Sequence, residues 1–312
     1  MYPSGMTVSE KLKIIQRLTG KPQEKLADDL GVSFPTLNSW INDRSTPHPK
    51  ALERIDELYL RLTGQKTIPA SALEAKNKIL EGRRKKYRDI IKTIVSAQDL
   101  YDEFLLSLTY NTNRIEGSTL TEDDTAAILF DNATLPDKSL TEHLEVKNHE
   151  AALKFLFRSL EAGDAITEEF GLKLHSILMN GIREDAGFYR RHAVRIVGSN
   201  VPPANYLKVP ELMKSLFRQV GKESQDVVHK ATKTHSHFEQ IHPFSDGNGR
   251  VGRLLLCAML LKENFPPAVI RQESRRFYIA ALRKSQLDND LSLLEDFVCD
   301  AVLNGFDILE RK

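Results

Sequence analysis

The sequence contains few of the residues that build disulfide-bonded or membrane architectures. Among its 312 residues there are only two cysteines, Cys257 and Cys299, and one tryptophan. Both cysteines lie in segments of helical hydrophobic period, so we expect buried thiols and no disulfide framework. No run approaches the roughly eighteen consecutive apolar residues of a membrane span, and Met1–Gln16 lacks the apolar core of a signal peptide. These absences predict a cytoplasmic protein with no membrane partner.

The sequence also lacks a charge excess of either sign. It has 44 Lys and Arg against 43 Asp and Glu, for a formal net charge of +1. A global polyelectrolyte interaction with nucleic acid is therefore excluded. Hydrophobic residues make up 41% and charged residues 28%, which is ordinary for a globular protein. The length allows one large domain and one small one.

What the chain does have is a dense run at residues 242–253, His-Pro-Phe-Ser-Asp-Gly-Asn-Gly-Arg-Val-Gly-Arg. Gly247 and Gly249 allow the backbone to approach a ligand closely. Apolar residues recur at helical period after them, which predicts a helix that begins near Asn248 and presents its N-terminus to an anion. Arg250 and Arg253 lie three residues apart on that helix, and their guanidinium groups match phosphate oxygens.

Two further residues of this run suggest chemistry on the bound phosphate. Asp246 is placed to share Mg²⁺ with the phosphates of a substrate, which is how proteins usually hold this ion. His242 has the only side chain in the run with an unperturbed pKa near neutrality, so it is the natural general base. The run therefore predicts a site for a metal-bound polyphosphate beside a group that loses a proton.

The run matches every fixed position of His-Pro-Phe-x-Asp-Gly-Asn-Gly-Arg-x-x-Arg, and in this the chain resembles Fic-domain proteins. The resemblance implies a helical core and the transfer of AMP from ATP to a Ser, Thr or Tyr hydroxyl of a protein. By position it assigns catalysis to His242, Asn248 and Arg250, and Mg²⁺ binding to Asp246. It assigns nucleotide binding to Gly247, Asn248, Gly249, Arg250 and Arg253. Tyr278 is expected at the adenosine pocket by analogy, with an ordinary core or surface tyrosine as the alternative.

An upstream segment, Thr112-Asn113-Arg114-Ile115-Glu116-Gly117, resembles the inhibitory motif [Ser/Thr]-x-x-x-Glu-[Gly/Asn] of the same family. Thr112 and Glu116 have helical i, i+4 spacing, and Gly117 stands where a glycine would end the helix. The resemblance implies that Glu116 pairs with Arg253 and blocks the position of the ATP γ-phosphate. The alternative is an ordinary surface helix end.

A third segment precedes the catalytic run. Arg191 to Val201 contains β-branched residues around Gly198-Ser199-Asn200, which predicts a short β-hairpin. In Fic-like proteins a hairpin flap at this place aligns the target segment by strand addition. We therefore expect Val194, Ile196, Val197 and Gly198 to form a target-docking flap, with an unpartnered surface hairpin as the alternative.

The first 65 residues read as a separate unit. Leu26-Ala27-x-x-Leu30-Gly31-Val32-Ser33 predicts a helix, a glycine turn and a helix start, which resembles the helix-turn-helix of Cro/repressor-like proteins. That geometry implies DNA contacts by Thr36, Asn38, Ser39 and Asn42. The second helix has no Lys or Arg, so phosphate contacts would come from elsewhere, for example the basic residues 83–88. The opposing interpretation is a trihelical module for dimerisation or target docking.

We therefore expect a mainly α protein: a helix-turn-helix domain at 1–65, a linker with a basic helix at 66–95, and a Fic domain at 96–312. The Fic-type helical core would carry the β-hairpin flap and an inhibitory helix near 107–117. One long helix is expected at 73–110. The expected function is adenylylation of a target protein or of the chain itself, with ATP as substrate, Mg²⁺ as cofactor, and a homodimer as the assembly.

Two alternatives stay open. One is a hydrolase that removes AMP from the same target, in which Glu116 would orient water. The other is a DNA-binding transcriptional regulator whose Fic-like domain senses nucleotide or target.

Overall fold

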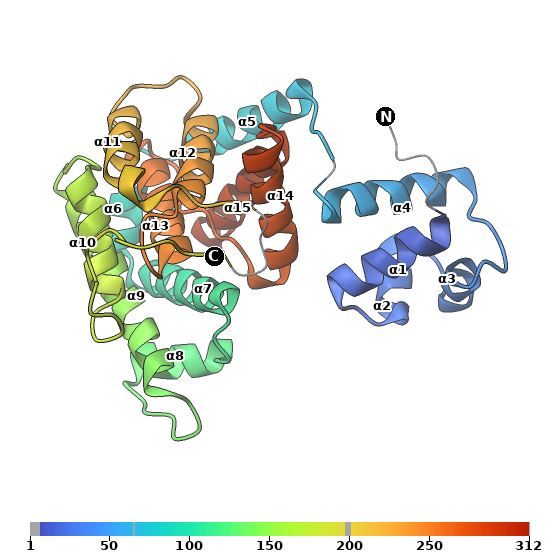
Figure 1. The fold of residues 1–312 in the computed structure, drawn as a ribbon, viewed down its shortest axis with the longest axis horizontal. Helices are drawn as coiled ribbons and strands as arrows, with labels where there is room; N and C mark the ends of the chain where they lie inside the picture. The colour runs from blue at the N-terminus through green and yellow to red at the C-terminus, as the bar shows by residue number, and fades with distance from the viewer. Residues whose placement is uncertain (1–6, 65, 197–200, 312) are drawn as a thin grey trace.

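The computed structural model describes residues 7–64, 66–196 and 201–311, and these are built from helices and connecting loops. They contain no strand, in agreement with the mainly α fold class predicted from the sequence. Figure 1 shows a small group of helices at the N-terminal end and a larger body formed by the helices that follow. No described helix is long and apolar enough to cross a membrane.

The N-terminal group consists of α1 (Val8–Thr19), α2 (Gln23–Leu30), α3 (Phe34–Ile41) and α4 (Pro49–Leu62). Gly31 ends α2 in the left-handed region at φ 68°, and the Ser33 side chain accepts a hydrogen bond from the Thr36 backbone to start α3. Side chains from all four helices, among them Leu37 and Trp40, form a core of their own. The helix-turn-helix expected from the sequence is therefore present.

The prediction of a single helix at 73–110 is wrong. The segment forms α5 (Ala70–Arg84), α6 (Ile90–Ser96) and most of α7 (Gln98–Glu116). The break before α6 depends on a distant residue: Asn264 accepts a hydrogen bond from the Ile90 backbone and donates one to the Tyr87 carbonyl. Asp89 then caps α6 by accepting from the Lys92 backbone. Hydrophobic period alone cannot reveal a break that a tertiary contact imposes.

The basic residues near the end of α5 are directed toward the protein's own C-terminal helices. Arg83 pairs with Asp307 and Glu310, at 2.9 Å and 2.8 Å. Arg84 pairs with Glu81 and also donates to the Glu263 carbonyl. These arginines anchor α5 to the larger body, so they are poorly placed to supply the phosphate contacts suggested for the basic segment.

The rest of the larger body is helical. It contains α8 (Glu122–Phe130), α9 (Leu140–Glu161), α10 (Glu168–Leu178), α11 (Val209–Val220), α12 (Val227–Ile241), α13 (Asn248–Lys262), α14 (Arg275–Leu287) and α15 (Ser292–Leu309). Two short 3₁₀ turns, Tyr206–Lys208 and Gln272–Ser274, precede α11 and α14.

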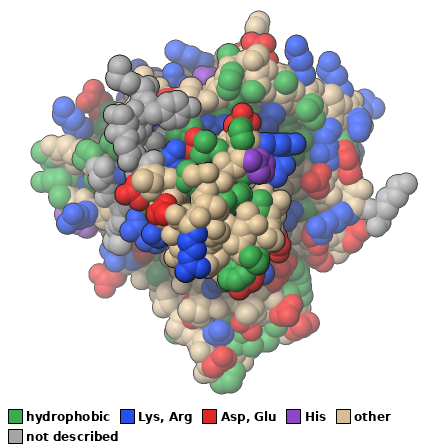
Figure 2. Space-filling model, turned by 90° about the vertical axis from the view of Figure 1, so that its right-hand side faces the viewer, with side chains coloured by type: hydrophobic (Ala, Val, Ile, Leu, Met, Phe, Trp, Pro, Cys, Tyr) green, Lys and Arg blue, Asp and Glu red, His purple; other side chains and the backbone are tan. Residues whose placement is uncertain are grey.

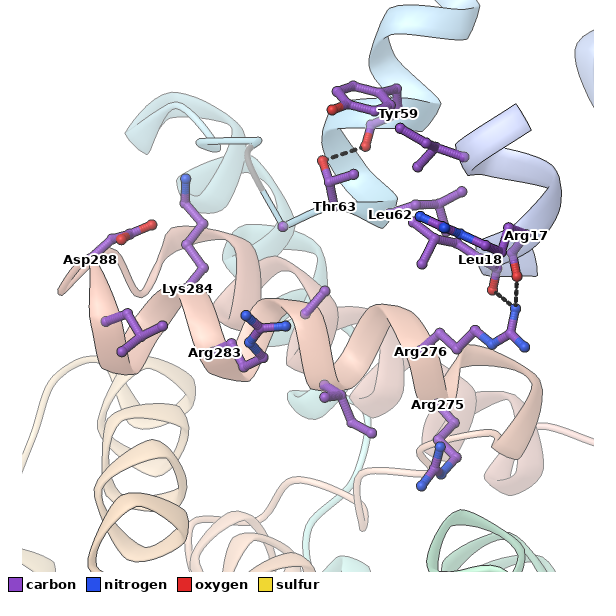
Figure 3. A pocket seen from close by; sticks show the side chains of 15 residues that line it. Arg17, Leu18, Tyr59, Leu62, Thr63, Arg275, Arg276, Arg283, Lys284 and Asp288 are labelled. Atoms are coloured by element: carbon purple, nitrogen blue, oxygen red, sulfur yellow. Dashed lines mark hydrogen bonds between the residues drawn. The ribbon is translucent and has the colours of Figure 1, made fainter. Parts of the chain in front are cut away.

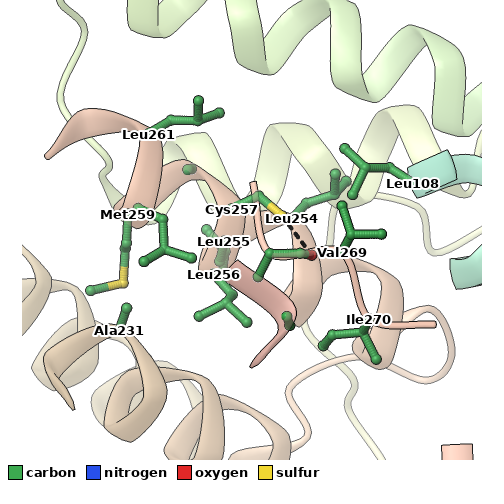
Figure 4. Packing of buried hydrophobic residues seen from close by; sticks show 14 of the residues in the cluster. Leu108, Ala231, Leu254, Leu255, Leu256, Cys257, Met259, Leu261, Val269 and Ile270 are labelled. Carbon is green, nitrogen blue, oxygen red and sulfur yellow. Dashed lines mark hydrogen bonds between the residues drawn. The ribbon is translucent and has the colours of Figure 1, made fainter. Parts of the chain in front are cut away.

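Helix α13 is the centre of this body. Every residue from Arg250 to Leu261 is buried, and α13 packs against α7, α9, α10 and α12. Figure 4 shows its apolar side chains between Ala231 of α12 and Leu108 of α7. Each fully buried leucine stabilises the fold by roughly 1.5–3 kcal/mol. The helix is thus a rigid platform for the loop at its N-terminus, and Cys257 within it is a buried free thiol, as is Cys299.

The described residues around the β-hairpin expected at 191–201 form no strand. Val194 and Ile196 lie in irregular backbone, while Val197 and Gly198 lie outside the described residues. The two arms that would have paired as strands are instead joined through Arg190, whose guanidinium donates to the carbonyls of His192 and Ala204. A buried side chain thus satisfies backbone groups that a strand ladder would otherwise use.

The two parts of the chain meet at α14. This helix contacts α4, and Arg276 at its start donates hydrogen bonds to the carbonyls of Arg17 and Leu18 at the end of α1. Figure 2 shows the side of the molecule on which α1 to α4 lie, at the right of Figure 1, where basic and acidic side chains are interspersed, in keeping with the net charge of +1.

Candidate active site

The loop between α12 and α13 is held in an unusual backbone conformation. His242 ends α12 at φ 52° and ψ 61°, in the left-handed region that residues with a side chain rarely adopt, and Gly247 follows at φ 77°. The Asn248 side chain closes the loop, because its oxygen accepts from the Phe244 backbone and its nitrogen donates to the Phe244 carbonyl. Asn248 thereby fixes the turn that presents the start of α13.

His175 of α10 supports this loop from beneath. Its ring stacks on Phe244 with centroids 3.7 Å apart and planes 3° from parallel. Its Nδ1 accepts from the Gly187 backbone, so its Nε2 is the nitrogen that donates to the Asp246 carbonyl. Burial lowers the pKa of His175 to about 4, so this histidine stays neutral and holds the loop through directed hydrogen bonds.

His242 is half-buried at the mouth of the loop. Its Nδ1 lies 3.3 Å from the Glu239 carbonyl, an arrangement that places a proton on Nδ1 and leaves Nε2 as an acceptor. Arg190 holds the backbone by donating to the His242 carbonyl at 2.7 Å. Burial lowers the pKa of His242 below its usual range, and Asp246 and Glu116 are close enough to oppose this shift in part. The imidazole is therefore neutral at neutral pH.

Arg250 projects from the first turn of α13 and is almost fully buried. Its Nη1 lies 2.7 Å from Oε1 of Glu145 on α9, and its Nη2 lies 3.7 Å from Oδ1 of Asp246. Its Nε is buried and has no hydrogen-bond partner among the described residues. An unpartnered guanidinium N–H at a helix start is a donor available to an anion.

Arg253, one turn further along α13, is occupied by the upstream motif. Its Nη2 lies 2.5 Å from Oε1 of Glu116, and its Nε donates to Oγ1 of Thr112 at 2.8 Å. The ion pair expected from the sequence is therefore present. The pKa of Arg253 lies above its usual range, because the Glu116 carboxylate outweighs the effect of burial.

Glu116 is the last residue of α7, and Gly117 caps the helix at φ 111°. Burial by itself would raise the pKa of the Glu116 carboxyl, but Arg253, with Arg250 and Arg275, lowers it. This carboxylate is therefore ionised. The carboxylate also contacts α13. A Cβ added at Gly249 would overlap Oε1 of Glu116, so the close approach of this carboxylate to the helix requires glycine at that position.

Asp246 has the chemistry and exposure that a magnesium ligand needs. Its side chain is 56% exposed, beside the buried Arg250. The Gly247 N–H donates to its Oδ1 at 2.6 Å, which orients the carboxylate. A single oriented carboxylate at an anion-binding helix start fits Mg²⁺ held jointly with substrate phosphates. The described residues include no cluster of three or more His, Cys, Asp or Glu that could hold a metal by itself.

The remaining residues singled out from the sequence lie away from this loop. Tyr278 is 4% exposed, and its hydroxyl lies 2.7 Å from Nε2 of His235 in the core beneath α13. On α3 and at its end, the Asn38 amide donates to the Gln23 side chain and the Asn42 amide donates to the Asn38 carbonyl. Thr36 and Ser39 are partly exposed on the same helix. The roles suggested for these side chains stay predictions.

Several residues of the site escaped the sequence analysis. Glu145 lies 105 residues from its partner Arg250, and Arg190 lies 52 residues from the carbonyl of His242 that it holds. Burial raises the pKa of Glu239 to about 8, and this carboxyl lies against Gly252, where a Cβ would overlap it. None of these residues lies near its partner in the sequence, so no local motif indicates its role.

Comparisons with known proteins agree with this geometry. Residues 165–260 match the family model described as Fic/DOC family, and residues 14–59 match a model described as helix-turn-helix. The chain is thus similar to the Fic/DOC family over residues 165–260 and to helix-turn-helix proteins over residues 14–59.

Curated relatives carry related names. The chain is 35% identical over 184 residues to "Protein adenylyltransferase fic-1" of Caenorhabditis elegans, covering 57% of this chain and 36% of that protein. It is 34% identical over 181 residues to "Protein adenylyltransferase Fic" of Nematostella vectensis, covering 56% of this chain and 42% of that protein. The chain therefore spans well under half the length of these relatives.

Solved structures share the fold. Fic-1 from C. elegans superposes with a TM-score of 0.68 at 23% identity, covering 98% of this chain and 88% of that one. A Fic-domain-containing signalling protein from Bacteroides thetaiotaomicron gives a TM-score of 0.67 at 23% identity, covering 75% of this chain and 97% of that one.

Proposed function

We propose that this chain is a protein adenylyltransferase that transfers AMP from ATP to a Ser, Thr or Tyr hydroxyl of a target protein or of itself. The observation that carries the proposal is the arrangement of His242, Asp246, Arg250 and Arg253 around the start of α13. Residues 165–260 match the Fic/DOC family model, and the relatives named protein adenylyltransferase support the same chemistry.

His242 acts as the general base. Its neutral Nε2 takes the proton of the target hydroxyl as that oxygen attacks the α-phosphorus of ATP. The bond from the α-phosphorus to the bridging oxygen breaks, and pyrophosphate leaves with the electron pair. The left-handed backbone at His242 and the Arg190 hydrogen bond hold the imidazole in position, so little reorganisation is needed when the substrate arrives.

The start of α13 binds the phosphates. The backbone of Gly247, Asn248 and Gly249 approaches the phosphates closely, and the N–H groups at the helix start and the positive end of the helix dipole favour negative charge there. Arg250 adds its unpartnered Nε, and Arg253 adds a second guanidinium once it is free. Asp246 would hold Mg²⁺, which neutralises phosphate charge when bound.

Glu116 inhibits the enzyme in this conformation. Its carboxylate takes the Arg253 guanidinium that would otherwise bind the γ-phosphate. A carboxylate at the negative end of a helix dipole is unfavourable by itself, so the Arg253 contact is what keeps it there. The chain therefore rests in a low-activity state.

The helix-turn-helix domain, which we place at residues 1–65, gives the protein a second partner, duplex DNA. Thr36, Asn38, Ser39 and Asn42 on α3 would contact base edges in the major groove, and a homodimer would place two such helices on two half-sites. The segment with Val194, Ile196, Val197 and Gly198 would align the target, and Tyr278 would support the nucleotide from beneath Arg253. A salt-dependent shift of DNA by the full chain tests the DNA contact, and no binding at low salt would exclude it.

The experiment for the catalytic proposal is intact-mass spectrometry of a Glu116→Gly variant incubated with ATP and Mg²⁺. We expect a mass increase of one AMP residue on the chain or on an added target protein. His242→Ala in the same background should abolish the increase while the melting temperature stays unchanged. His237→Ala, on the same helix but outside the loop, is the matched control and should leave labelling intact. Persistent labelling by the His242 variant would reject His242 as the base.

A further inference from the structure

A large cavity lies between the two parts of the chain, away from the catalytic loop. Its volume is about 660 Å³, and α1, α4 and α14 form its walls. Small-molecule sites commonly have volumes of roughly 300–1,000 Å³ and mostly apolar linings. Here the apolar part includes Leu18, Leu62 and Ile279. The cavity therefore has the size and walls of a ligand site.

The charge of this cavity is strongly one-sided. Five cationic side chains line it, against the single carboxylate of Asp288: Arg17, Arg275, Arg276, Arg283 and Lys284. The whole chain has a net charge of only +1, so this excess is a local feature. Like charges gathered around a partly apolar space repel one another, and an anion in the space would relieve that repulsion.

None of the four arginines has an ion-pair partner among the described residues, and only Arg275 and Arg276 donate hydrogen bonds to backbone carbonyls. Figure 3 shows Arg17 on α1 and Arg283 on α14, on opposite walls of the cavity. The Nε of Arg283 is buried and makes no hydrogen bond to a described residue. Lys284, by contrast, pairs with Asp290 at 3.2 Å. Free guanidinium groups on facing walls suit a ligand that carries more than one anionic group.

We propose that this cavity, called the α1–α14 cleft below, binds a small ligand with two or more phosphate groups. Guanidinium forks bind phosphate oxygens bidentately, and the apolar wall suits the organic part of such a ligand. The residues of α3 expected to contact bases do not line the cleft, so it is not an extension of the DNA-reading surface. The class of ligand is a nucleoside polyphosphate or a comparable polyphosphorylated metabolite.

The cleft is also connected to the inhibitory helix. Arg275 donates from its Nε to the Ile115 carbonyl at 2.6 Å, and Ile115 immediately precedes Glu116. The next residue, Arg276, donates to carbonyls at the end of α1. An anion that draws Arg275 into the cleft removes a hydrogen bond from the end of α7. Occupancy of the cleft therefore loosens the Glu116 segment, a consequence that rests on the proposed inhibitory function.

Hydrogen-exchange mass spectrometry of the full chain with sodium tripolyphosphate, in the absence of divalent cations, tests both steps. We expect protection of residues 14–20 and 275–288, and faster exchange of residues 113–118. Protection confined to 244–253 would show binding at the catalytic loop alone and overturn the proposal. Protection of the cleft without faster exchange at 113–118 would overturn the connection to Glu116. This experiment does not measure AMP transfer, so its result is independent of whether the proposed adenylyltransferase activity is correct.

A pair of charge-reversal variants tests the same site by calorimetry. Arg17→Glu with Arg283→Glu should weaken tripolyphosphate binding by about tenfold or more, because two charge-assisted contacts are lost. Lys25→Glu with Lys50→Glu makes the same charge change on exposed residues outside the cleft and should bind like wild type. Equal affinities of the two double variants for tripolyphosphate would overturn the proposal of a binding site in this cleft. Should the first variant fail to fold, the exchange experiment on the unmodified chain still decides.

Discussion

Replacement of Glu116 by glycine should activate the enzyme. In the structure the Glu116 carboxylate occupies Arg253 at 2.5 Å, and the Thr112 hydroxyl holds the same guanidinium. In the proposed function, the γ-phosphate of ATP must displace this carboxylate to bind productively. Glycine removes this competitor and leaves the arginine and the start of α13 unchanged.

The size of the effect follows from the contact that is lost. A buried hydrogen bond to a charged group contributes about 1.5–3 kcal/mol, while an exposed ion pair contributes about 0.2–1 kcal/mol. The Glu116 side chain is 36% exposed and that of Arg253 is 9% exposed, so the pair lies between these cases. A value of about 1–2 kcal/mol corresponds to a five- to thirtyfold increase in productive ATP binding.

Incorporation of label from α-³²P-ATP at an ATP concentration below KM measures this increase directly. Glu103→Gly, on the same helix and paired with the exposed Arg311, is the matched control for glycine in α7 and should not activate. Equal labelling by wild type and the Glu116 variant would refute the competition between this carboxylate and the γ-phosphate.

Two further predictions concern neighbouring contacts. Thr112→Val removes one of the two side-chain contacts on the Arg253 guanidinium but keeps the Glu116 carboxylate, so labelling should rise by a smaller factor, about two- to fivefold. Activation equal to that of the Glu116→Gly variant would contradict this prediction. His149, His175 and His235 have pKa values lowered by burial to about 3, about 4 and about 3. Below pH 6.5 the unfolded chain binds protons at these histidines that the native state does not bind, so each histidine lowers stability by ~1.4 kcal/mol per pH unit as the pH falls from about 6 to 4. Protonated Glu239 opposes one of these three contributions above about pH 4.5. Urea midpoints between pH 6 and 5 measure the slope, and His235→Gln should reduce it by ~1.4 kcal/mol per pH unit; an unchanged slope would show that His235 protonates in the native state.

Much of the fold could be predicted from the sequence where local patterns sufficed. The helix-turn-helix follows from a glycine and a serine cap between two short apolar patterns, and the structure has Gly31 and Ser33 in those roles. The start of α13 at Asn248 and the end of α7 at Gly117 were visible for the same reason. Caps and hydrophobic period act within a few residues, so the sequence displays them directly.

Predictions failed where distant residues compete for the backbone. The break before α6 requires Asn264, and the arms of the expected hairpin are held by Arg190. Hydrogen-bond partners so far apart in sequence leave no periodic trace. Local propensity was therefore overridden by tertiary hydrogen bonds in both places.

The sequence by itself determined the reactive groups: a base, a carboxylate and two arginines spaced around a helix start, with a glutamate upstream on another helix. Only the tertiary structure decided which groups meet, bringing Glu116 onto Arg253 across 137 residues and Glu145 onto Arg250 across 105. It also placed Arg275 and Arg276 between α7 and the N-terminal domain. The physical reason is that charge and hydrogen bonding act over a few ångströms of space, whatever the separation along the chain.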